Sequence, residues 1–579
     1  MRRTTASLIV MIMLIVALAA CSGNDNAGGN NSKQGNDPSA NKGSNVSGNQ
    51  SDSGPQDPLG KYEEPITVTQ VLAYRAPEEG DALKGVTPET NGYLKDLKEM
   101  LNIDLKYEWS VPADQFEQKF SLAIASGDLP DIMQIDYNTY EKFKEQDVLA
   151  DLTDAYKNYA SPLLKKTIEA DNGFALKSLT TDGKLLGVAT SGEGVVQIVW
   201  IRSDWLANLK LQPPTTIDEL EKVAEAFVKN DPDQNGSDDT YGIVFNKNLL
   251  GWGFDARGAF YSHGAYPGAW IKDADGKLVA GEVQPETKTA LARMQSWYKN
   301  GILDKEFALR DENKASEDIV ASKVGIAFGE WWYPNWPLNL NKDNDPKAEW
   351  IPLMLPSLDG SAPGKTLISR TVSSILVVNK KAKHPEAAIK MANFYLELSK
   401  PKYAVKESPD FKGAKNGYIY LWFQPRFYYP KMFDEVMAKV SDAIDAKQDQ
   451  LDLPDDFPGA GEAQSVFTNA KKFFENPKDN AAWGMWYSRG ARDGGVGLSK
   501  KVVDEKHTVY NEYYGPPTPT MLEKGASLNK LMIETFTKII MGSAPITDFD
   551  KFADSWKKLG GNDITDEVNA WYAENAVKE

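Results

Sequence analysis

The stretch between residues 231 and 239 carries oxygen-bearing side chains at a regular spacing. Asp231 and Asp239 take positions 1 and 9 of this loop, and a glycine takes position 6. Alternate side chains of such a loop converge on one calcium ion, and the glycine permits the sharp turn. Position 12 is Gly242, where an EF-hand has a bidentate glutamate, so one strong ligand is missing. The residues therefore predict either a structural calcium site or an ordinary Asp/Asn/Gly turn in water. The expected ligands are Asp231, Asp233, Asn235, Ser237 and Asp239.

Cys21 is the only cysteine in the chain and follows a short apolar run, from Leu8 to Ala20, that two arginines precede. A basic start and a short apolar core are typical of an export signal, and this core is shorter than the roughly 20 residues of a membrane-spanning helix. The run Leu18-Ala19-Ala20-Cys21 resembles the lipobox of bacterial lipoproteins. That resemblance implies cleavage before Cys21 and a diacylglycerol on its sulfur. The alternative is an ordinary secretory signal with an incidental cysteine.

Composition narrows the function classes. The segment after Cys21 is polar and almost free of apolar residues, which predicts a disordered linker. The net charge of −17 and the lack of any basic run argue against a nucleic-acid partner. About 520 residues follow the linker, which is too many for one core and predicts at least two lobes. The 15 tryptophans favour sugar binding mildly, because indole faces stack on sugar rings.

Residues for common catalytic sites do not assemble into a pattern. The three histidines, His263, His384 and His507, form no HExxH motif, and the sequence contains no G-x-S-x-G motif or P-loop. The 82 acidic residues supply many carboxylate pairs, and nothing singles out one pair for glycoside hydrolysis. The residues alone therefore leave a glycoside hydrolase open.

The elements that must position these side chains begin with alternating strands and helices. Apolar spacing predicts strands over 66–72, 104–109 and 132–135, with helices over 91–101 and 116–125 between them. This order predicts a parallel α/β sheet. A helix also begins at Thr216, because Glu219 stands three residues later as the partner of a capping box. A further strand is expected over 324–328, directly before Trp331 and Trp332.

The segments 125–132 and 148–153, with Asp136 between them, resemble those of the extracellular solute-binding proteins of bacterial carbohydrate ABC transporters, the type related to maltose- and alginate-oligosaccharide-binding proteins. Further segments follow in the family's order at 187–189, 199–206, 329–332 and 374–388. The tail resembles that of large Gram-positive lipoprotein members. In this family the residues after the strand 132–135 line the ligand cleft, and alginate binders carry a calcium loop similar to the one above.

The resemblance implies an α/β fold with two lobes, of the periplasmic-binding-protein-like type II, whose chain crosses near residues 197, 369 and 512. The expected divisions begin with a signal peptide that ends at the lipidated cysteine, at 1–21, and a linker at 22–61. The first lobe is expected to comprise 62–197 and 370–512, and the second lobe 198–369 and 513–579.

The function implied is that of a monomeric receptor outside the cytoplasm, tethered to the membrane by its lipid, which captures an oligosaccharide between its lobes and delivers it to an ABC permease. A lipid-anchored glycoside hydrolase or lyase and an oligopeptide receptor are the alternatives. The two tryptophans after the strand 324–328 cannot both point inward, which favours one at a cleft. Asp136 is expected to accept from a sugar hydroxyl. The candidate ligand-binding residues are Tyr74, Asp136, Tyr137, Trp252, Trp331, Trp332, Trp483 and Trp486.

Overall fold

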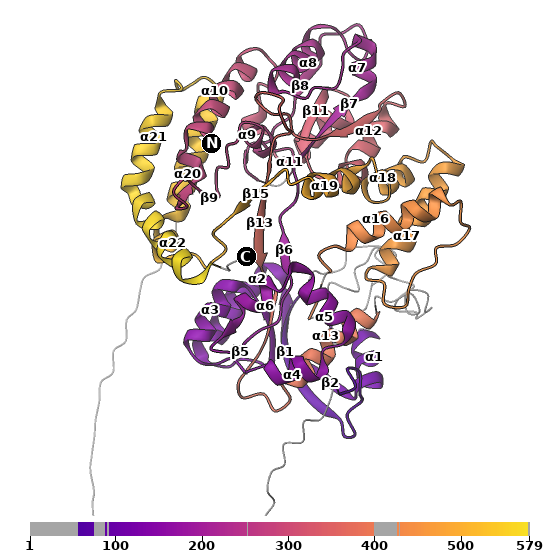
Figure 1. The fold of residues 1–579 in the computed structure, drawn as a ribbon, viewed down its shortest axis with the longest axis vertical. Helices are drawn as coiled ribbons and strands as arrows, with labels where there is room; N and C mark the ends of the chain where they lie inside the picture. Colours follow the sequence, from indigo (N-terminus) through magenta and orange to yellow (C-terminus); the bar gives the residue numbers. More distant parts are fainter. Residues whose placement is uncertain are drawn as a thin grey trace, which may run out of the picture. The chain divides into compact units, whose positions relative to one another are not determined.

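A computed structural model describes residues 56–74, 87–89, 92–251, 253–398, 425–427 and 429–576 (Figure 1). All of them fall in one compact unit that the contacts assign to Gly54–Glu579. Cys21 and the predicted linker up to residue 55 lie outside the described residues, as does Trp252. No helix in the described part of the chain combines the length and the apolar character that a bilayer crossing requires.

The first hydrophobic core, which we call the first lobe, is built on strand β1 (Ile66–Tyr74). Every second residue of its first half is buried, and the strand pairs in parallel with β2 (Ile103–Pro112), as predicted. The two helices predicted around β2 are present. The helices of this lobe are α1 (Gly92–Leu101), α2 (Ala113–Ser126), α3 (Tyr137–Glu145), α4 (Thr153–Tyr159), α5 (Pro162–Ile168), α6 (Phe174–Ser178) and α13 (Glu386–Leu398). A short hairpin joins β4 (Thr180–Thr181) to β5 (Lys184–Leu185).

Strand β3 (Ile132–Ile135) occupies the residues that the sequence predicts, but its partner is different. It pairs antiparallel with β14 (Ile375–Val378), which returns about 240 residues later. The backbone N–H of Thr69 on β1 instead donates to the Asp131 side chain, which directly precedes β3, at 3.0 Å. The parallel ladder predicted for this lobe is therefore confirmed for β1 and β2, whereas β3 is paired with a strand that short-range patterns cannot connect to it.

The second lobe is organised by a sheet whose strands run in the order β12 (Trp350–Leu353), β7 (Ile198–Arg202), β11 (Val324–Gly329) and β8 (Tyr241–Ile243). Every residue of β7 and β11 is buried, because helices cover both faces of these central strands. Gly325 on β11 allows this close cover. A Cβ at that position would lie 2.5 Å from the Phe227 ring and 2.6 Å from the Trp205 ring.

Helix α8 (Ile217–Lys229) begins with the capping box that the sequence predicts. Thr216 accepts from the backbone N–H of Glu219 at 3.2 Å, and the Glu219 carboxylate accepts from the backbone N–H of Thr216. The other helices of this lobe are α7 (Ser203–Leu209), α9 (Arg257–Tyr261), α10 (Pro285–Lys299), α11 (Glu312–Val320), α12 (Leu338–Asn344), α20 (Pro519–Ile540), α21 (Asp548–Trp556) and α22 (Asn562–Asn575). Strands β9 (Trp270–Lys272) and β10 (Leu278–Ala280) form a hairpin at its edge.

In the described part of the chain between residues 429 and 507, four further helices are present. They are α16 (Met432–Asp445), α17 (Ala460–Glu475), α18 (Asn480–Arg489) and α19 (Gly495–Asp504). Helices α16 and α17 share a small core of their own. Trp483 on α18 and Val502 on α19 pack with residues of the second-lobe sheet such as Trp200. This part of 370–512 therefore contacts the second lobe, although the sequence places the whole of 370–512 in the first.

A three-stranded sheet lies between the two lobes (Figure 1). Its order is β15 (Thr508–Asn511), β13 (Thr366–Val372) and β6 (Ser191–Glu193), with β13 parallel to β15 and antiparallel to β6. The three crossing positions expected from the sequence, near 197, 369 and 512, lie in or next to these strands. The domain boundaries themselves stay a prediction.

Candidate functional site

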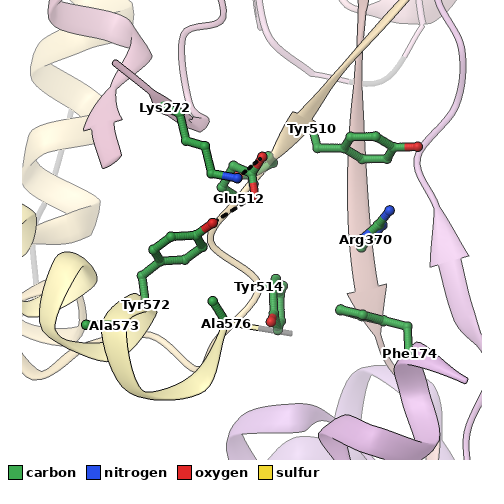
Figure 2. Close-up of a pocket in the computed structure, with 10 residues that line it drawn as sticks. Phe174, Lys272, Arg370, Tyr510, Glu512, Tyr514, Tyr572, Ala573 and Ala576 are labelled. Atoms are coloured by element: carbon green, nitrogen blue, oxygen red, sulfur yellow. Dashed lines mark hydrogen bonds and ion pairs between the residues drawn. The ribbon is translucent and has the colours of Figure 1, made fainter. Parts of the chain in front are cut away.

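A cavity of about 450 Å³ opens beside the three-stranded sheet (Figure 2). Four aromatic rings, two cations and one carboxylate line it, and they come from both lobes and from the strands between them. The lining residues are Phe174, Lys272, Arg370, Tyr510, Asn511, Glu512, Tyr514, Tyr572, Ala573 and Ala576. Aromatic faces combined with a few convergent polar groups are typical of a small-ligand site.

Arg370 stands on β13 with an aromatic ring on two sides. Its Cζ lies 4.3 Å from the centre of the Tyr510 ring on β15 and 5.6 Å from that of Phe174 on α6. Phe174 in turn meets the Tyr514 ring edge-on, with centroids 4.7 Å apart. Because β13 and β15 are parallel neighbours, Arg370 and Tyr510 lie close together although 140 positions separate them in the sequence. The first lobe contributes Phe174, so this wall of the cavity joins residues of separate elements.

The opposite wall is an ionic group on the second-lobe side. Lys272 at the end of β9 places its Nζ 3.1 Å from Glu512, and the Tyr572 hydroxyl of α22 donates to the same carboxylate at 3.4 Å. The hydroxyl of Tyr572, together with Glu512, raises the pKa of Lys272, so its ammonium remains charged at neutral pH. The backbone N–H of Glu512 donates to the Trp270 carbonyl at 2.9 Å and fixes this segment to β9.

Among the predicted ligand-binding residues that the structure describes, Tyr137 interacts electrostatically with Tyr514, which lines the cavity. Burial and the neighbouring Glu141 raise the pKa of its phenol, and Tyr514, which lines the cavity, adds to the shift. Asp136, just before it, is exposed and caps helix α3 by accepting from the Thr139 N–H at 2.8 Å. Tyr74 is half-buried at the end of β1, opposite Pro112 of β2. Its role as a ligand-binding residue stays a prediction.

Trp331 and Trp332 follow β11 and are both half-buried. The Trp331 ring lies 4.5 Å from that of Phe433 on α16, and the Arg489 guanidinium lies 5.0 Å from its centre. The Trp332 ring stacks on Trp336, with centroids 5.9 Å apart and planes at 18°. The first of these rings therefore meets the α16–α18 helices, and the second packs at the start of the η4 turn (Tyr333–Asn335).

A buried ionic group stands behind Trp332. Its indole N–H donates to the carboxylate of Glu330, whose other oxygen lies 3.3 Å from Arg257. Arg257 also binds Asp255, with Nε 2.7 Å from Oδ2. Both carboxyl groups are almost fully buried and share one guanidinium. Burial outweighs Arg257 and raises the pKa of Asp255 to about 7, and Glu330 contributes in the same direction.

The two remaining tryptophans of the candidate set pack against helices. Trp483 is 6% exposed, and Tyr487 stacks on it with centroids 5.4 Å apart. Trp486 is half-buried and meets Phe474 edge-on at 5.5 Å. Neither residue lines the 450 Å³ cavity. Trp252 lies outside the described residues.

The acidic loop 231–239 folds around the side chain of Asn235. The Asn235 amide donates to Asp233 at 2.8 Å and to Asp239 at 3.2 Å, and its backbone N–H donates to Asp231 at 3.0 Å. Burial and then the neighbouring Asp231 raise the pKa of the Asp233 carboxyl, as expected where like charges crowd. No group of three or more histidine, cysteine or acidic side chains in the described ranges has a geometry suited to a metal ion.

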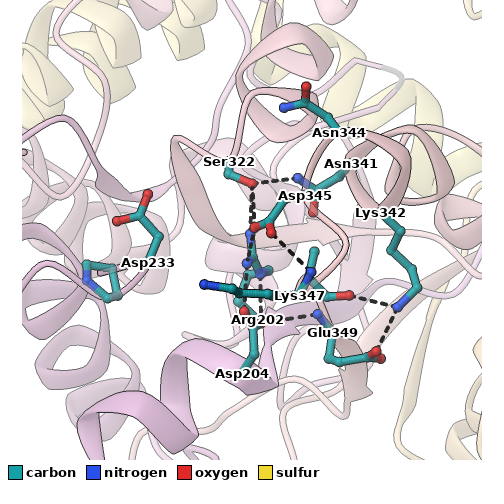
Figure 3. Close-up of polar contacts among 12 residues, drawn as sticks. Arg202, Asp204, Asp233, Ser322, Asn341, Lys342, Asn344, Asp345, Lys347 and Glu349 are labelled. Atoms are coloured by element: carbon teal, nitrogen blue, oxygen red, sulfur yellow. Dashed lines mark hydrogen bonds and ion pairs between the residues drawn. The ribbon is translucent and has the colours of Figure 1, made fainter. Parts of the chain in front are cut away.

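Close to this loop, a polar network around Arg202 is structural (Figure 3). The guanidinium is 1% exposed and makes two 2.7 Å bonds to Asp204 and one of 2.9 Å to Asp345. Trp205 covers it at 4.7 Å. Because its donors meet protein acceptors and its face is covered, this arginine at the end of β7 stabilises the second-lobe sheet.

His263 and His384 are not among the residues that line the cavity. His263 is 3% exposed and follows helix α9, where its Nδ1 bonds the Ala259 carbonyl at 2.8 Å. His384 lies 3.4 Å from Glu386 and is partly exposed. His263 is therefore a buried residue, and His384 is a partly exposed one.

Comparison with known proteins gives consistent relatives. A family model described as bacterial extracellular solute-binding protein matches residues 77–397. Lipoprotein LipO of Bacillus subtilis is 24% identical over 489 residues, which are 83% of this chain and 88% of that protein. The polygalacturonan/rhamnogalacturonan-binding protein YtcQ of the same species is 32% identical over 253 residues, 42% of this chain and 47% of its own length.

Among solved structures, the alginate-binding protein AlgQ2, crystallised without calcium ion, superimposes with a TM-score of 0.55 at 17% identity. The match covers 90% of this chain and 100% of that one. Such structural neighbours are two-lobed solute-binding proteins, and the predicted two-lobed α/β fold is therefore confirmed.

Proposed function

The chain belongs to the bacterial extracellular solute-binding protein family, and we propose that it captures an oligosaccharide in the cavity beside its crossing strands. It then delivers the sugar, chemically unchanged, to the permease of an ABC importer. YtcQ, a relative that is 32% identical over the matched region, is named as a polygalacturonan/rhamnogalacturonan-binding protein, which supports carbohydrate as the ligand class.

The observation that carries this proposal is the composition of the cavity. Phe174, Tyr510, Tyr514 and Tyr572 offer ring faces, while the charged side chains among them offer donors and acceptors for hydroxyl groups. Apolar faces of sugar rings pack on aromatic rings, and the ring hydroxyls need such polar partners. The lining comes from both lobes, so a hinge-like closure of one lobe on the other would enclose the ligand.

Asp136, Tyr137, Trp331 and Trp332 are proposed as further ligand contacts. Tyr137 lies near Tyr514 of the cavity, which supports its inclusion. Trp331 and Trp332 keep part of their surface exposed and stand at the end of a central strand, where α/β sheets bind ligands. Tyr74, Trp252, Trp483 and Trp486 stay predicted ligand contacts.

The protein is further proposed to act as a monomer, held at the outer face of the cell membrane by a lipid on Cys21. The lipobox supports this anchoring, as does the relative named as a lipoprotein. Calcium is proposed to bind the loop 231–239 with a structural role. The convergence of Asp231, Asp233 and Asp239 on Asn235 supports it, because a cation would take the place of these hydrogen bonds and relieve the crowding of charge.

A thermal-shift screen followed by calorimetry tests the binding proposal. A ligand that binds only the folded protein raises its melting temperature, so plant and algal oligosaccharides are screened at millimolar concentration. Tyr510→Ala should weaken the binding of the best ligand at least tenfold. Tyr298→Ala, which removes a ring on α10 that does not line the cavity, should leave it unchanged. Equal affinity of wild type and Tyr510→Ala for a bound sugar would exclude this cavity as its site.

A further inference from the structure

The indole of Trp331 is supported by side chains of the helices α16 and α18. The ring of Phe433 on α16 lies 4.5 Å from it, and the Arg489 guanidinium at the end of α18 lies 5.0 Å from its centre. The guanidinium is 5.9 Å from the Phe433 ring, so the two side chains contact the indole as neighbours and do not enclose it from opposite directions. Trp331 accordingly keeps part of its surface exposed. An indole that is supported on one side and partly open is suited to stack on a sugar ring.

The guanidinium that supports this ring is itself fixed in place. Its Nε lies 2.9 Å from a carboxylate oxygen of Glu462 on α17, and its Nη1 donates to the Ser488 hydroxyl at 3.0 Å. The same Nη1 lies 3.3 Å from the sulfur of Met485. A cation over the face of a tryptophan is attracted by the ring, so a guanidinium held in this way restricts the motion of the indole. A ring that is ordered before the ligand arrives costs less to order on binding.

The backbone of Trp331 is fixed by the same group of helices. A Cβ at Gly495, the first residue of α19, would clash with the Trp331 carbonyl oxygen, so this helix begins directly against it. Gly484 on α18 approaches the η4 turn in a similar way, because a Cβ there would lie 2.5 Å from the Pro334 carbonyl oxygen. The position of Trp331 therefore depends on residues that follow it by 100 positions or more.

The start of α16 also contacts the first lobe. Glu435 lies 3.4 Å from Lys166 of α5, and the Tyr429 hydroxyl donates to Glu435 at 2.6 Å. Phe433 stands two residues before Glu435, so this turn of α16 lies between the Trp331 ring and the first lobe. A ring that stacks on a ligand held between the lobes needs such a position.

We propose that Arg489 and Phe433 are positioning residues, which hold the Trp331 indole in the orientation that stacks on the bound oligosaccharide. The helices α16–α18 are then part of the binding site, although their residues do not line the 450 Å³ cavity. This inference rests on the proposed function and on Trp331 as a ligand contact, and it deepens that function by assigning the residues that orient this contact.

Calorimetry of the full chain with galacturonan, fructan and alginate oligomers of three to five residues tests the role of the guanidinium. Arg489→Gln, which removes the cation, should weaken the binding of the tightest oligomer about threefold. Arg489→Lys, which keeps a cation and loses the fork, should restore part of the affinity. In a chain that already carries Trp331→Ala, Arg489→Gln should cause no further loss, because residues that act as a unit are not additive.

Arg492→Gln is the control for these variants, because it deletes the same charge from an exposed turn before α19. Its affinity for the oligomer should equal that of the wild type. Circular dichroism of each variant establishes that it is folded.

Fluorine NMR of the protein labelled with 5-fluorotryptophan observes the ring itself. The Trp331 signal, identified by its absence from Trp331→Phe, should shift when the oligomer is added to the wild type. It should broaden or move in Arg489→Gln before any oligomer is added, and it should stay unchanged in Arg492→Gln.

Two results would overturn this inference and leave the receptor function standing. One is a Trp331 signal that does not respond to an oligomer that binds, and the other is losses of affinity that add in the double variant. Absence of binding for every oligomer would overturn the proposed function, and this inference with it.

Discussion

The indole N–H of Trp332 donates to the carboxylate of Glu330, two residues earlier, and this carboxylate is itself nearly buried. Arg257 binds its other oxygen, so the orientation of a candidate stacking ring depends on a buried ion pair. Glu330→Ala leaves Arg257 with one fewer counter-charge and should lower the free energy of unfolding by about 3 kcal/mol. Urea unfolding followed by fluorescence measures it.

Glu317→Ala is the control for this change, because Glu317 pairs with Lys314 at 2.8 Å on the open surface of α11. Exposed pairs contribute little, so its effect should stay within about 0.5 kcal/mol. Equal losses of stability in the two variants would contradict the importance of the buried pair behind Trp332.

Asp255 should make the stability of the protein depend on pH. The pKa of its carboxyl is about 7 in the folded state, against about 4 for an unfolded aspartate. Between these values the folded protein holds a proton that the unfolded chain has released, so the free energy of unfolding falls as pH rises from about 4 to 7. Asp255→Asn should abolish this contribution. The difference in unfolding free energy between wild type and variant is measured from pH 5 to 8.

The exposed Asp550→Asn variant serves as the comparison, since its carboxylate is paired only at the surface. Its difference from the wild type should not change with pH over this range. A difference between Asp255→Asn and the wild type that is the same at pH 5 and pH 8 would contradict the buried, protonated carboxyl.

Calcium should stabilise the protein through the loop 231–239. Calcium at a free concentration of one hundred times its Kd adds about 2.7 kcal/mol to the free energy of unfolding. EDTA should therefore lower the melting temperature reversibly. Asp233→Ala should melt at the same temperature with calcium and with EDTA. Because the pKa of the Asp233 carboxyl is raised and a protonated carboxyl is a poor ligand, binding should weaken as pH falls.

Asp275→Ala, in the exposed turn between β9 and β10, should keep the full response to calcium. A wild-type protein whose melting temperature is unaffected by EDTA would rule out the calcium site.

Membrane anchoring should depend on Cys21, because its thiol receives the lipid if residues 18–21 form a lipobox. Cys21→Ser should appear in the culture medium or remain as the unprocessed precursor. Cell fractionation with intact-mass measurement distinguishes these outcomes from the wild type. A variant that stays in the membrane fraction at the mature mass would contradict lipid attachment at this residue.

The sequence predicts the local elements of this fold well, because they depend on neighbouring residues. The capping box of Thr216 and Glu219 and the strand β3 follow from patterns a few residues long. Asp136 also has a local signal, since an aspartate before a helix caps it, and the structure has it in that role.

The cavity could not be predicted in the same way. Phe174, Lys272, Arg370 and Glu512 come from four elements spread over more than 330 residues, and none belongs to a motif with a periodicity. Two signals were available in retrospect. Segments that cross between the lobes were expected near 369 and 512, beside Arg370 and at Glu512, and aromatic residues accumulate at 510–514. Tryptophans were predicted as ligand contacts instead, because the residue type alone suggests stacking on sugar rings, whereas the sequence does not show where in the fold each ring lies.

The fate of the bound sugar tests the central claim most directly. The wild-type protein is incubated for days with an oligosaccharide that it binds, and the ligand is then analysed by mass spectrometry. The Kd for the same ligand is measured for the wild type and for the double variant Trp331→Ala/Trp332→Ala. The receptor function predicts an intact ligand that elutes from a saturable complex, with micromolar or tighter binding that the double variant weakens at least tenfold. Each lost ring stacking contributes on the order of 1 kcal/mol. Shortened or unsaturated products that accumulate catalytically would show that the protein is an enzyme and would contradict the account.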